Sequence, residues 1–357
     1  MDILVKKVKK MNKYCFHVIP FDEFNQLFMY NLLIDEWEEF RTVERYDELY
    51  LSIPPSMLGL FPYTDRFIIT DEWAGTDYFK RWNALTPGDE LPEYTKTREL
   101  LQSHCKEHKI EVLPNAFSYP PSIHPYVINF TKMTRLIKSD KMKFLNCRKS
   151  VYDYYHSLDD YVVVDGRYFN NPKKSRRNML FKDVILKSLQ EGLKVINTTM
   201  VDLPSLRDYL LSEGIPSHVI DENYSEVKLS YEEMIACFMG AKAVFTVGNA
   251  GGISSKLFIQ CNLFVYHPPL VRHDLMDQNQ KHLLEEYRQW IWSDSTFGYG
   301  GTSMFEARIQ KTHSHLLTSK FNENDIKGEV LWSNVKRLQK PSISESSFID
   351  ESKLIYI

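Results

Sequence analysis

The chain lacks any long hydrophobic run. No window of about 18 uncharged apolar residues, the length that crosses a bilayer, occurs among its 357 residues. The first residues, MDILVKKVKKMNKYCFHV, carry charges inside the apolar stretch and no small-residue cleavage site, so they differ from a secretory signal peptide. We therefore expect a cytoplasmic protein without a membrane span.

Paired cysteine and histidine motifs are also missing. The five cysteines are an odd number without Cys-x-x-Cys spacing, which predicts buried, reduced thiols and argues against a disulfide framework or a zinc site. His17, His124 and His267 are scattered, without His-x-x-His or His-Glu-x-x-His spacing. We therefore expect no metal site.

Neither sign of charge is in large excess. The net charge of −3 excludes a uniformly basic nucleic-acid binder, although local clusters can still matter. The length suffices for two domains of roughly 150–200 residues, each with its own core. We place these domains at residues 1–150 and 151–335. A polar tail, 336–357, follows, and we expect its apolar end, KLIYI, to pack onto another surface or to stay mobile.

Strands and helices alternate in the second half of the chain. The apolar runs predict strands, the helical spacing predicts helices, and Ser230 with Glu233 forms a capping box before the last helix. This alternation predicts a parallel sheet with helices on both faces and ligands at the carboxyl ends of the strands. The expected strands are 160–166, 194–197, 218–221 and 244–247, and the expected helices are 179–193, 203–214 and 231–240. Gly192 is the expected stop signal at the C-terminal end of the first of these helices.

The first half is less regular, but the same patterns predict an α/β domain there. Proline-rich turns interrupt it at residues 52–56 and 118–125. The expected elements are strands at 14–19, 48–53, 66–70 and 110–113, and an amphipathic helix at 24–40.

A glycine-rich turn follows the strand at 244–247, in the sequence AVFTVGNAGGISSK. Its glycines permit close backbone approach, and the run from residue 253 to 259 can continue as a helix whose first N–H groups attract an anion such as a diphosphate. A plain strand-to-helix connection that binds nothing is the alternative. The expected diphosphate contacts are Gly248, Asn249, Gly251, Gly252, Ile253, Ser254 and Ser255.

The second half of the chain resembles the donor-binding domain of GT-B glycosyltransferases, particularly the branch related to bacterial heptosyltransferases. The resemblance lies in the order VVVDGR, basic loop, helix, KVINTT, helix, SYEE, AVFTVGNAGGISSK. The resemblance covers roughly residues 161–267. It implies two Rossmann-like domains facing a central cleft, with a nucleotide sugar bound by the second. The chain departs from this family at Ala250 and Gly251, where an acidic or Ser-Gly pair is frequent, and it lacks a glycine-rich acceptor loop in the first half. The sugar and the acceptor therefore stay open.

The resemblance also assigns roles in the second domain. It places the basic loop at 167–177 over the cleft, where its cations would stabilise the departing nucleoside diphosphate in place of a metal ion, so that no cofactor is needed. A solvated basic loop is the alternative. The loop's cations are Arg167, Lys173, Lys174, Arg176 and Arg177, and the expected nucleoside contacts are Thr198, Thr199, Val227, Lys228 and Leu229.

A general base must come from the first domain. Asp71 directly follows the expected strand at 66–70, so we expect it to project from the carboxyl end of that strand into the cleft. Its carboxylate would there take the acceptor's proton in a single inverting displacement. A similar strand followed by Thr-Asp occurs in phage DNA glucosyltransferases. Asp22 and Glu23, after the first strand, are rivals for this role. Glu72 and Trp73 are the expected acceptor contacts.

The acceptor has two candidates. Residues 131–149 hold seven basic residues and one acidic one, a composition suited to DNA, whose hydroxymethylated base would be flipped out of the duplex. The same spacing is found in exposed linker helices. We favour a saccharide or cell-envelope glycan as acceptor of a hexosyl or pentosyl group. DNA is the alternative, as are a non-catalytic GT-B-like binding protein and a nucleotide-sugar epimerase.

Overall fold

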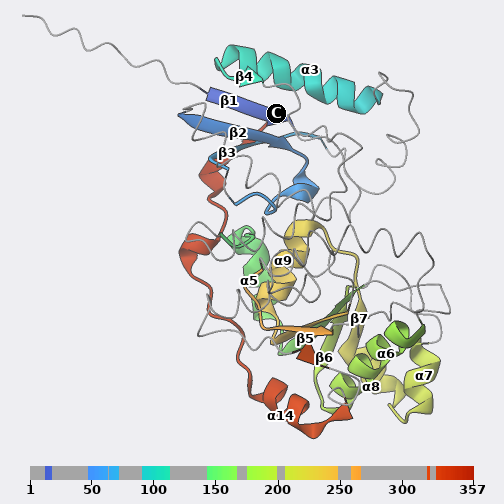
Figure 1. Cartoon of the computed structure of the whole chain (residues 1–357). Coiled ribbons are helices and arrows are strands. Elements are labelled where there is room, and N and C mark those ends of the chain that lie inside the picture. The colour runs from blue at the N-terminus through green and yellow to red at the C-terminus, as the bar shows by residue number, and fades with distance from the viewer. Residues whose placement is uncertain are drawn as a thin grey trace, which may run out of the picture.

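The computed structural model describes residues 13–17, 47–62, 64–71, 91–112, 143–166, 175–198, 206–247, 259–266, 320–321 and 327–357. Within these ranges the chain forms two parallel β-sheets, one in each of two lobes (Figure 1). This confirms the expected α/β class. The helix expected at 24–40 lies outside the described residues, and no helix within them is long and apolar enough to cross a membrane.

The first sheet has the strand order β11-β3-β2-β1-β4, with every described pairing parallel. Five of the six residues of β2 are buried, because a parallel sheet is covered on both faces. Helix α3 packs on it through Leu101 and Cys105, which share a core cluster with Cys15 and Ile68. The strands are β1 (Lys13–His17), β2 (Glu48–Ile53), β3 (Arg66–Ile69), β4 (Glu111–Val112) and β11 (Leu354–Tyr356), and the helices are η1 (Pro55–Met57) and α3 (Pro92–Glu107).

The second sheet has the order β10-β9-β8-β5-β6-β7, again parallel. The chain runs outward from β5 to β7 and then returns to β8, which pairs with the other side of β5. This is the doubly wound order, in which the direction reverses between β5 and β8. The strands are β5 (Tyr161–Gly166), β6 (Lys194–Asn197), β7 (Tyr224–Glu226), β8 (Ala243–Val247), β9 (Leu263–Tyr266) and β10 (Lys320–Phe321).

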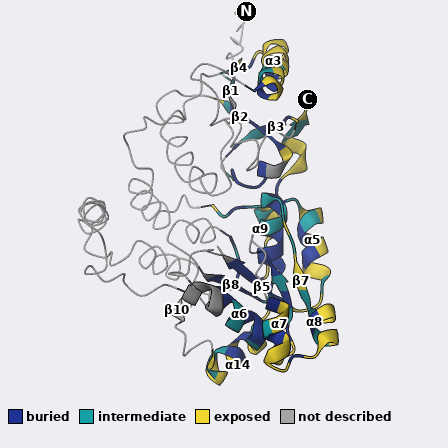
Figure 2. Cartoon of the chain, turned by 90° about the vertical axis from the view of Figure 1, so that its right-hand side faces the viewer, coloured by how far each residue is buried: buried dark blue, intermediate teal, exposed yellow. Residues whose placement is uncertain are grey.

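Helices cover the second sheet and leave their outer faces exposed (Figure 2). Phe181 and Ile185 of α6 are fully buried, and Phe245 lies between Phe264 and Trp332, with ring centroids 5.0 and 5.3 Å away. Trp332 thus anchors the C-terminal helix in the core of this lobe. The helices are α5 (Lys149–Ser157), α6 (Ser175–Gln190), α7 (Leu206–Ser212), α8 (Ser217–Asn223), α9 (Tyr231–Gly240) and α14 (Glu329–Arg337).

Most predicted elements of the second half are confirmed. The strand at 194–197 and the helix at 231–240 have the expected bounds, and the capping box of Ser230 and Glu233 is present in both directions. Gly192, the expected stop signal after α6, has the left-handed φ of 75° that glycine tolerates best. All five cysteines are buried and free, as expected.

Two expectations for this half were wrong. Residues 218–221 form part of helix α8, and the strand lies just after them in β7. Two of the three residues of β7 are exposed, so this edge strand lacks the apolar pattern by which strands are recognised. Helix α6 begins at Ser175, four residues before the expected start, so part of the expected basic loop is helical.

The C-terminal segment returns to the first lobe. After α14 the chain runs along α5, in red at the left of Figure 1, and β11 pairs with β3. Lys340 Nζ donates to the carbonyl oxygens of His156 and Leu158, and the Ile349 N–H donates to the Cys147 carbonyl at 2.9 Å. Two short helices, η5 (Glu345–Ser347) and η6 (Glu351–Lys353), lie on this path. The last residues of the chain therefore form the outer strand of the first sheet.

Candidate functional site

The reversal of strand order in the second sheet marks the candidate site. Ligands of doubly wound sheets bind outside the carboxyl ends of the strands at such a reversal. Here it lies between β5 and β8, where Asp165 pairs with Thr246 and Gly166 with Val247. The basic loop leaves β5 and the glycine-rich turn leaves β8. The two segments expected to hold a diphosphate therefore start from neighbouring strand ends.

The first turn of α6 adds to this arrangement. Arg176 and Arg177 lie in that turn, which contains no acidic residue. Cations at the positive end of a helix dipole are unfavourable, and an anion bound there would relieve the conflict. The side chains of both arginines lie outside the described part of the chain, as do Arg167, Lys173, Lys174 and the whole of 248–255.

Buried polar groups gather at the same edge of the sheet. Asp165 at the end of β5 is 7% exposed, and its Oδ1 accepts a hydrogen bond of 2.8 Å from Thr198 Oγ1. Asn197 and Thr246 are buried beside them. Sequence reasoning named Thr198 but missed Asp165. An acidic residue directly after three valines was the available signal, because a buried strand rarely carries a charge without a specific use.

Some of the expected nucleoside contacts already have partners within the protein. The Thr198 hydroxyl donates to Asp165, and the Val227 N–H donates to the Asn197 carbonyl at 3.0 Å, which continues the pairing of β6 with β7. Lys228 is exposed and Leu229 is partly exposed, whereas Thr199 lies outside the described residues. These positions follow β6 and β7, on one side of the reversal.

Of the candidate bases, the structure describes only Asp71, which lies at the carboxyl edge of the first sheet. Asp71 follows β3 through Thr70 and is exposed. The first sheet has its own reversal, between β1 and β4, two strands away from β3. Asp22 and Glu23 come after β1 in the sequence and lie outside the described residues, as do Glu72 and Trp73.

Contacts between the lobes show which edges of the two sheets face each other. Helix α9 leads into the amino end of β8, so its own first turns lie at the carboxyl edge of the second sheet. Helix α9 contacts η1, which follows the carboxyl end of β2. A Cβ atom placed on Gly59 would lie 3.2 Å from Ile235 Cδ1 of α9. The carboxyl edges of both sheets therefore face the junction between the lobes, with α9 between them (Figure 1).

Two doubly wound α/β lobes whose carboxyl edges face each other are the arrangement that defines a known fold type. The fold is of the GT-B type. The comparisons with known proteins found no matching family model and no matching curated protein.

Several solved structures have a similar arrangement at low identity. One is a glycosyl transferase of family 9 from Veillonella parvula, 11% identical, with 85% of this chain and 97% of that chain covered at a TM-score of 0.39. Another is the E. coli heptosyltransferase WaaC with ADP-2-deoxy-2-fluoro heptose, which is 11% identical. The match covers 73% of this chain and 90% of that chain at a TM-score of 0.38. A putative UDP-N-acetylglucosamine 2-epimerase from Listeria monocytogenes is 10% identical, 87% and 99% covered, TM-score 0.34. With TM-scores below 0.4 these likenesses are distant.

Proposed function

We propose that the protein is a glycosyltransferase that moves a hexosyl or pentosyl group from a nucleoside-diphosphate sugar to a hydroxyl of a saccharide. One observation carries the proposal. The basic segment after β5 and the glycine-rich turn after β8 leave adjacent strands at the reversal of the second sheet, where Gly166 pairs with Val247. Helix starts and cations are the groups that proteins use to hold a pyrophosphate.

The chemistry follows from this charge distribution. As the glycosidic bond breaks, its electron pair passes to the pyrophosphate oxygen, and negative charge grows on the leaving nucleoside diphosphate. Guanidinium groups of Arg176 and Arg177, with amide N–H groups at residues 251–253, would stabilise that charge. The proposal therefore requires no metal ion. A carboxylate of the first lobe, Asp71 or its rival Asp22, would accept the proton of the attacking hydroxyl, with inversion at the anomeric carbon.

Two of the three cations in residues 143–149, the described end of the basic run at 131–149, weaken the case for DNA as acceptor. Arg148 is paired with Glu232, and Lys149 Nζ lies 2.8 Å from Asp153 Oδ1. These two cations are compensated within the fold, so they add little attraction for a phosphate backbone.

The first experiment measures nucleotide binding. Isothermal titration with UDP, ADP, GDP and CDP, each with and without EDTA, should reveal binding of at least one nucleotide that EDTA does not weaken. Arg176→Ala should lower the affinity for that nucleotide about 10- to 100-fold, because a hydrogen bond to a charged group contributes about 1.5–3 kcal/mol. Lys187→Ala removes the same charge from the last turn of the same helix and should have no effect. Absence of binding by all four nucleotides would refute the proposal.

The second experiment measures turnover. A panel of nucleotide sugars should show slow hydrolysis by the wild-type enzyme and slower hydrolysis by Asp71→Asn. If Asp71→Asn keeps full activity, the base is elsewhere and Asp22→Asn is the next variant. An isomerised nucleotide sugar formed without an acceptor would identify an epimerase. Salt-sensitive retention of the protein on DNA would favour the DNA acceptor.

A further inference from the structure

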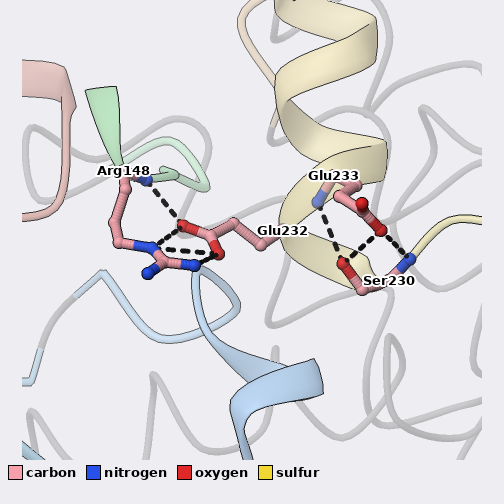
Figure 3. Close-up of polar contacts among 4 residues, drawn as sticks. All are labelled: Arg148, Ser230, Glu232 and Glu233. Carbon is pink, nitrogen blue, oxygen red and sulfur yellow. Dashed lines mark hydrogen bonds and ion pairs between the residues drawn. The ribbon is translucent and has the colours of Figure 1, made fainter. Parts of the chain in front are cut away.

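An ion pair between a partly exposed arginine, Arg148, and a buried glutamate, Glu232, lies where the chain crosses from the first lobe to the second. The Arg148 N–H donates to Glu232 Oε1 at 2.8 Å, its Nε donates to the same oxygen at 3.0 Å, and its Nη2 donates to Oε2 at 2.8 Å (Figure 3). The Glu232 side chain is only 5% exposed. A two-pronged arrangement of this kind fixes the relative orientation of its partners far better than a single contact does.

The pair joins the starts of two helices. Arg148 is the residue before α5, and Glu232 lies in the first turn of α9. Both helices lead to the amino ends of strands of the second sheet, so their first turns lie together at its carboxyl edge. A carboxylate there is stabilised by two positive helix ends as well as by the guanidinium, which compensates for the cost of burying it.

The residues just before Arg148 bind the other parts of the junction. The Asn146 N–H donates to the Gly59 carbonyl of the first lobe at 3.3 Å. The Cys147 carbonyl accepts from Ile349 of the returning C-terminal segment. Three successive residues therefore contact the first lobe, the second crossing of the chain and helix α9. A change in the angle between the lobes must disturb at least one of these contacts.

We propose that Arg148 and Glu232 are a positioning pair that fixes the angle between the lobes and thereby the distance between the donor at the second sheet and the base of the first. The inference rests on the proposed function, because only a reaction between two lobes needs such a distance. Nucleotide binding uses the second lobe alone. Loss of the pair should therefore spare nucleotide affinity and reduce turnover.

The chain offers a matched control for this test. Glu233 lies next to Glu232 in the same helical turn, but its carboxylate bonds Ser230 in the capping box and not the junction (Figure 3). Glu232→Gln and Glu233→Gln remove the same charge from the same turn. We expect each variant to bind the nucleotide that the wild type binds within about twofold of its affinity, and the kcat for donor hydrolysis to fall at least about tenfold only in Glu232→Gln.

A distance measurement tests the geometry directly. Leu100 of α3 is 46% exposed and Val330 of α14 is 76% exposed, one in each lobe, and all five native cysteines are buried. Nitroxide labels on Leu100→Cys and Val330→Cys therefore report the separation of the lobes by pulsed electron paramagnetic resonance. The distribution should be narrow in the parent and in Glu233→Gln, and broad in Glu232→Gln.

The outcomes separate this inference from the proposed function. If the wild type binds no nucleotide and hydrolyses no donor, the proposed function fails, and the label distances still decide whether the pair sets the lobe angle. If Glu232→Gln and Glu233→Gln give equal distributions, or equal turnover in an active enzyme, the inference is overturned. Should Glu232→Gln fail to fold, Arg148→Lys keeps the charge but loses the two-pronged geometry, and its distribution must then be broader than that of Glu233→Gln.

Discussion

The two sheets of this protein are completed in different ways. The second takes five of its six strands from residues 161–266, close together in sequence. The first takes β1 to β4 from the N-terminal part of the chain and β11 from the last residues, so that its edge depends on a segment that has already passed through the other lobe. The second lobe is therefore assembled mainly from local units, whereas the first requires a contact between the two ends of the chain. We expect perturbations at the junction to affect the first lobe more.

Gly59→Ala should produce the largest difference between the lobes. Gly59 has a φ of 95°, and a Cβ atom there would lie 2.2 Å from the backbone oxygen of Asn146. We expect Gly59→Ala to lower the free energy of unfolding by about 2–4 kcal/mol, because a backbone atom cannot move aside without displacing the chain. Gly214→Ala is the control, since Gly214 has a φ of 85° with nothing within 4 Å and should lose only about 1 kcal/mol. Urea unfolding measures both, and equal losses would contradict the prediction.

Deletion of residues 354–357 should have the next largest effect. It removes the pairing of β11 with β3 and the packing of Ile355 and Ile357 on the core of the first sheet. We expect about 2–3 kcal/mol of destabilisation, confined to the first lobe. Amide hydrogen exchange should accelerate in β1 to β3 and stay unchanged in β5 to β8. Tyr356→Ser is the control, because Tyr356 is 65% exposed. It should change the free energy of unfolding by less than about 0.5 kcal/mol.

Ser230→Ala tests the second lobe with a smaller effect. Ser230 Oγ accepts from the Glu233 N–H, so the substitution removes the side-chain half of the capping box. We expect Ser230→Ala to lower the free energy of unfolding by about 1 kcal/mol. The label distance between the lobes should not change, because Ser230 makes no contact with Arg148 among the described hydrogen bonds. A broadened distribution in Ser230→Ala would show that helix stability alone sets the lobe angle.

Thiol reactivity should distinguish the lobes least. All five cysteines are buried, and burial raises the pKa of Cys147 and of Cys237 to about 12. At pH 8 the thiols of Cys147 and Cys237 stay protonated, and the thiolate is the reactive form. The other three cysteines are protected because burial keeps the reagent away from them. We expect no reaction with a disulfide reagent in the native state and five equivalents after unfolding in denaturant. Rapid reaction of a thiol in either native lobe would show that its core opens locally.

Sequence reasoning succeeded where a local signal was strong. The valines at 162–164 and the apolar run of β8 correctly predicted buried parallel strands. The pair Ser230 and Glu233 correctly predicted a helix start. It failed at β7, where an exposed edge strand has no apolar pattern, and it did not anticipate α3, α5 or α14, whose buried residues are few among polar ones. The residue patterns alone predicted two separate loops, and only the resemblance to GT-B glycosyltransferases assigned both of them to one diphosphate. Their common origin at neighbouring strands depends on strand order, which no local pattern encodes.

The sequence by itself determined the buried strands, the capping box, the glycine stop after α6 and the reduced cysteines, because each of these depends on residues near one another in the chain. Only the tertiary structure decided that β5 lies beside β8, that Asp165 bonds Thr198 and that the last three strand residues pair with β3. It also decided that Arg148 meets Glu232, 84 positions away. Such contacts form when distant segments bury their surfaces together, so their free energy belongs to the packed molecule and not to any segment alone.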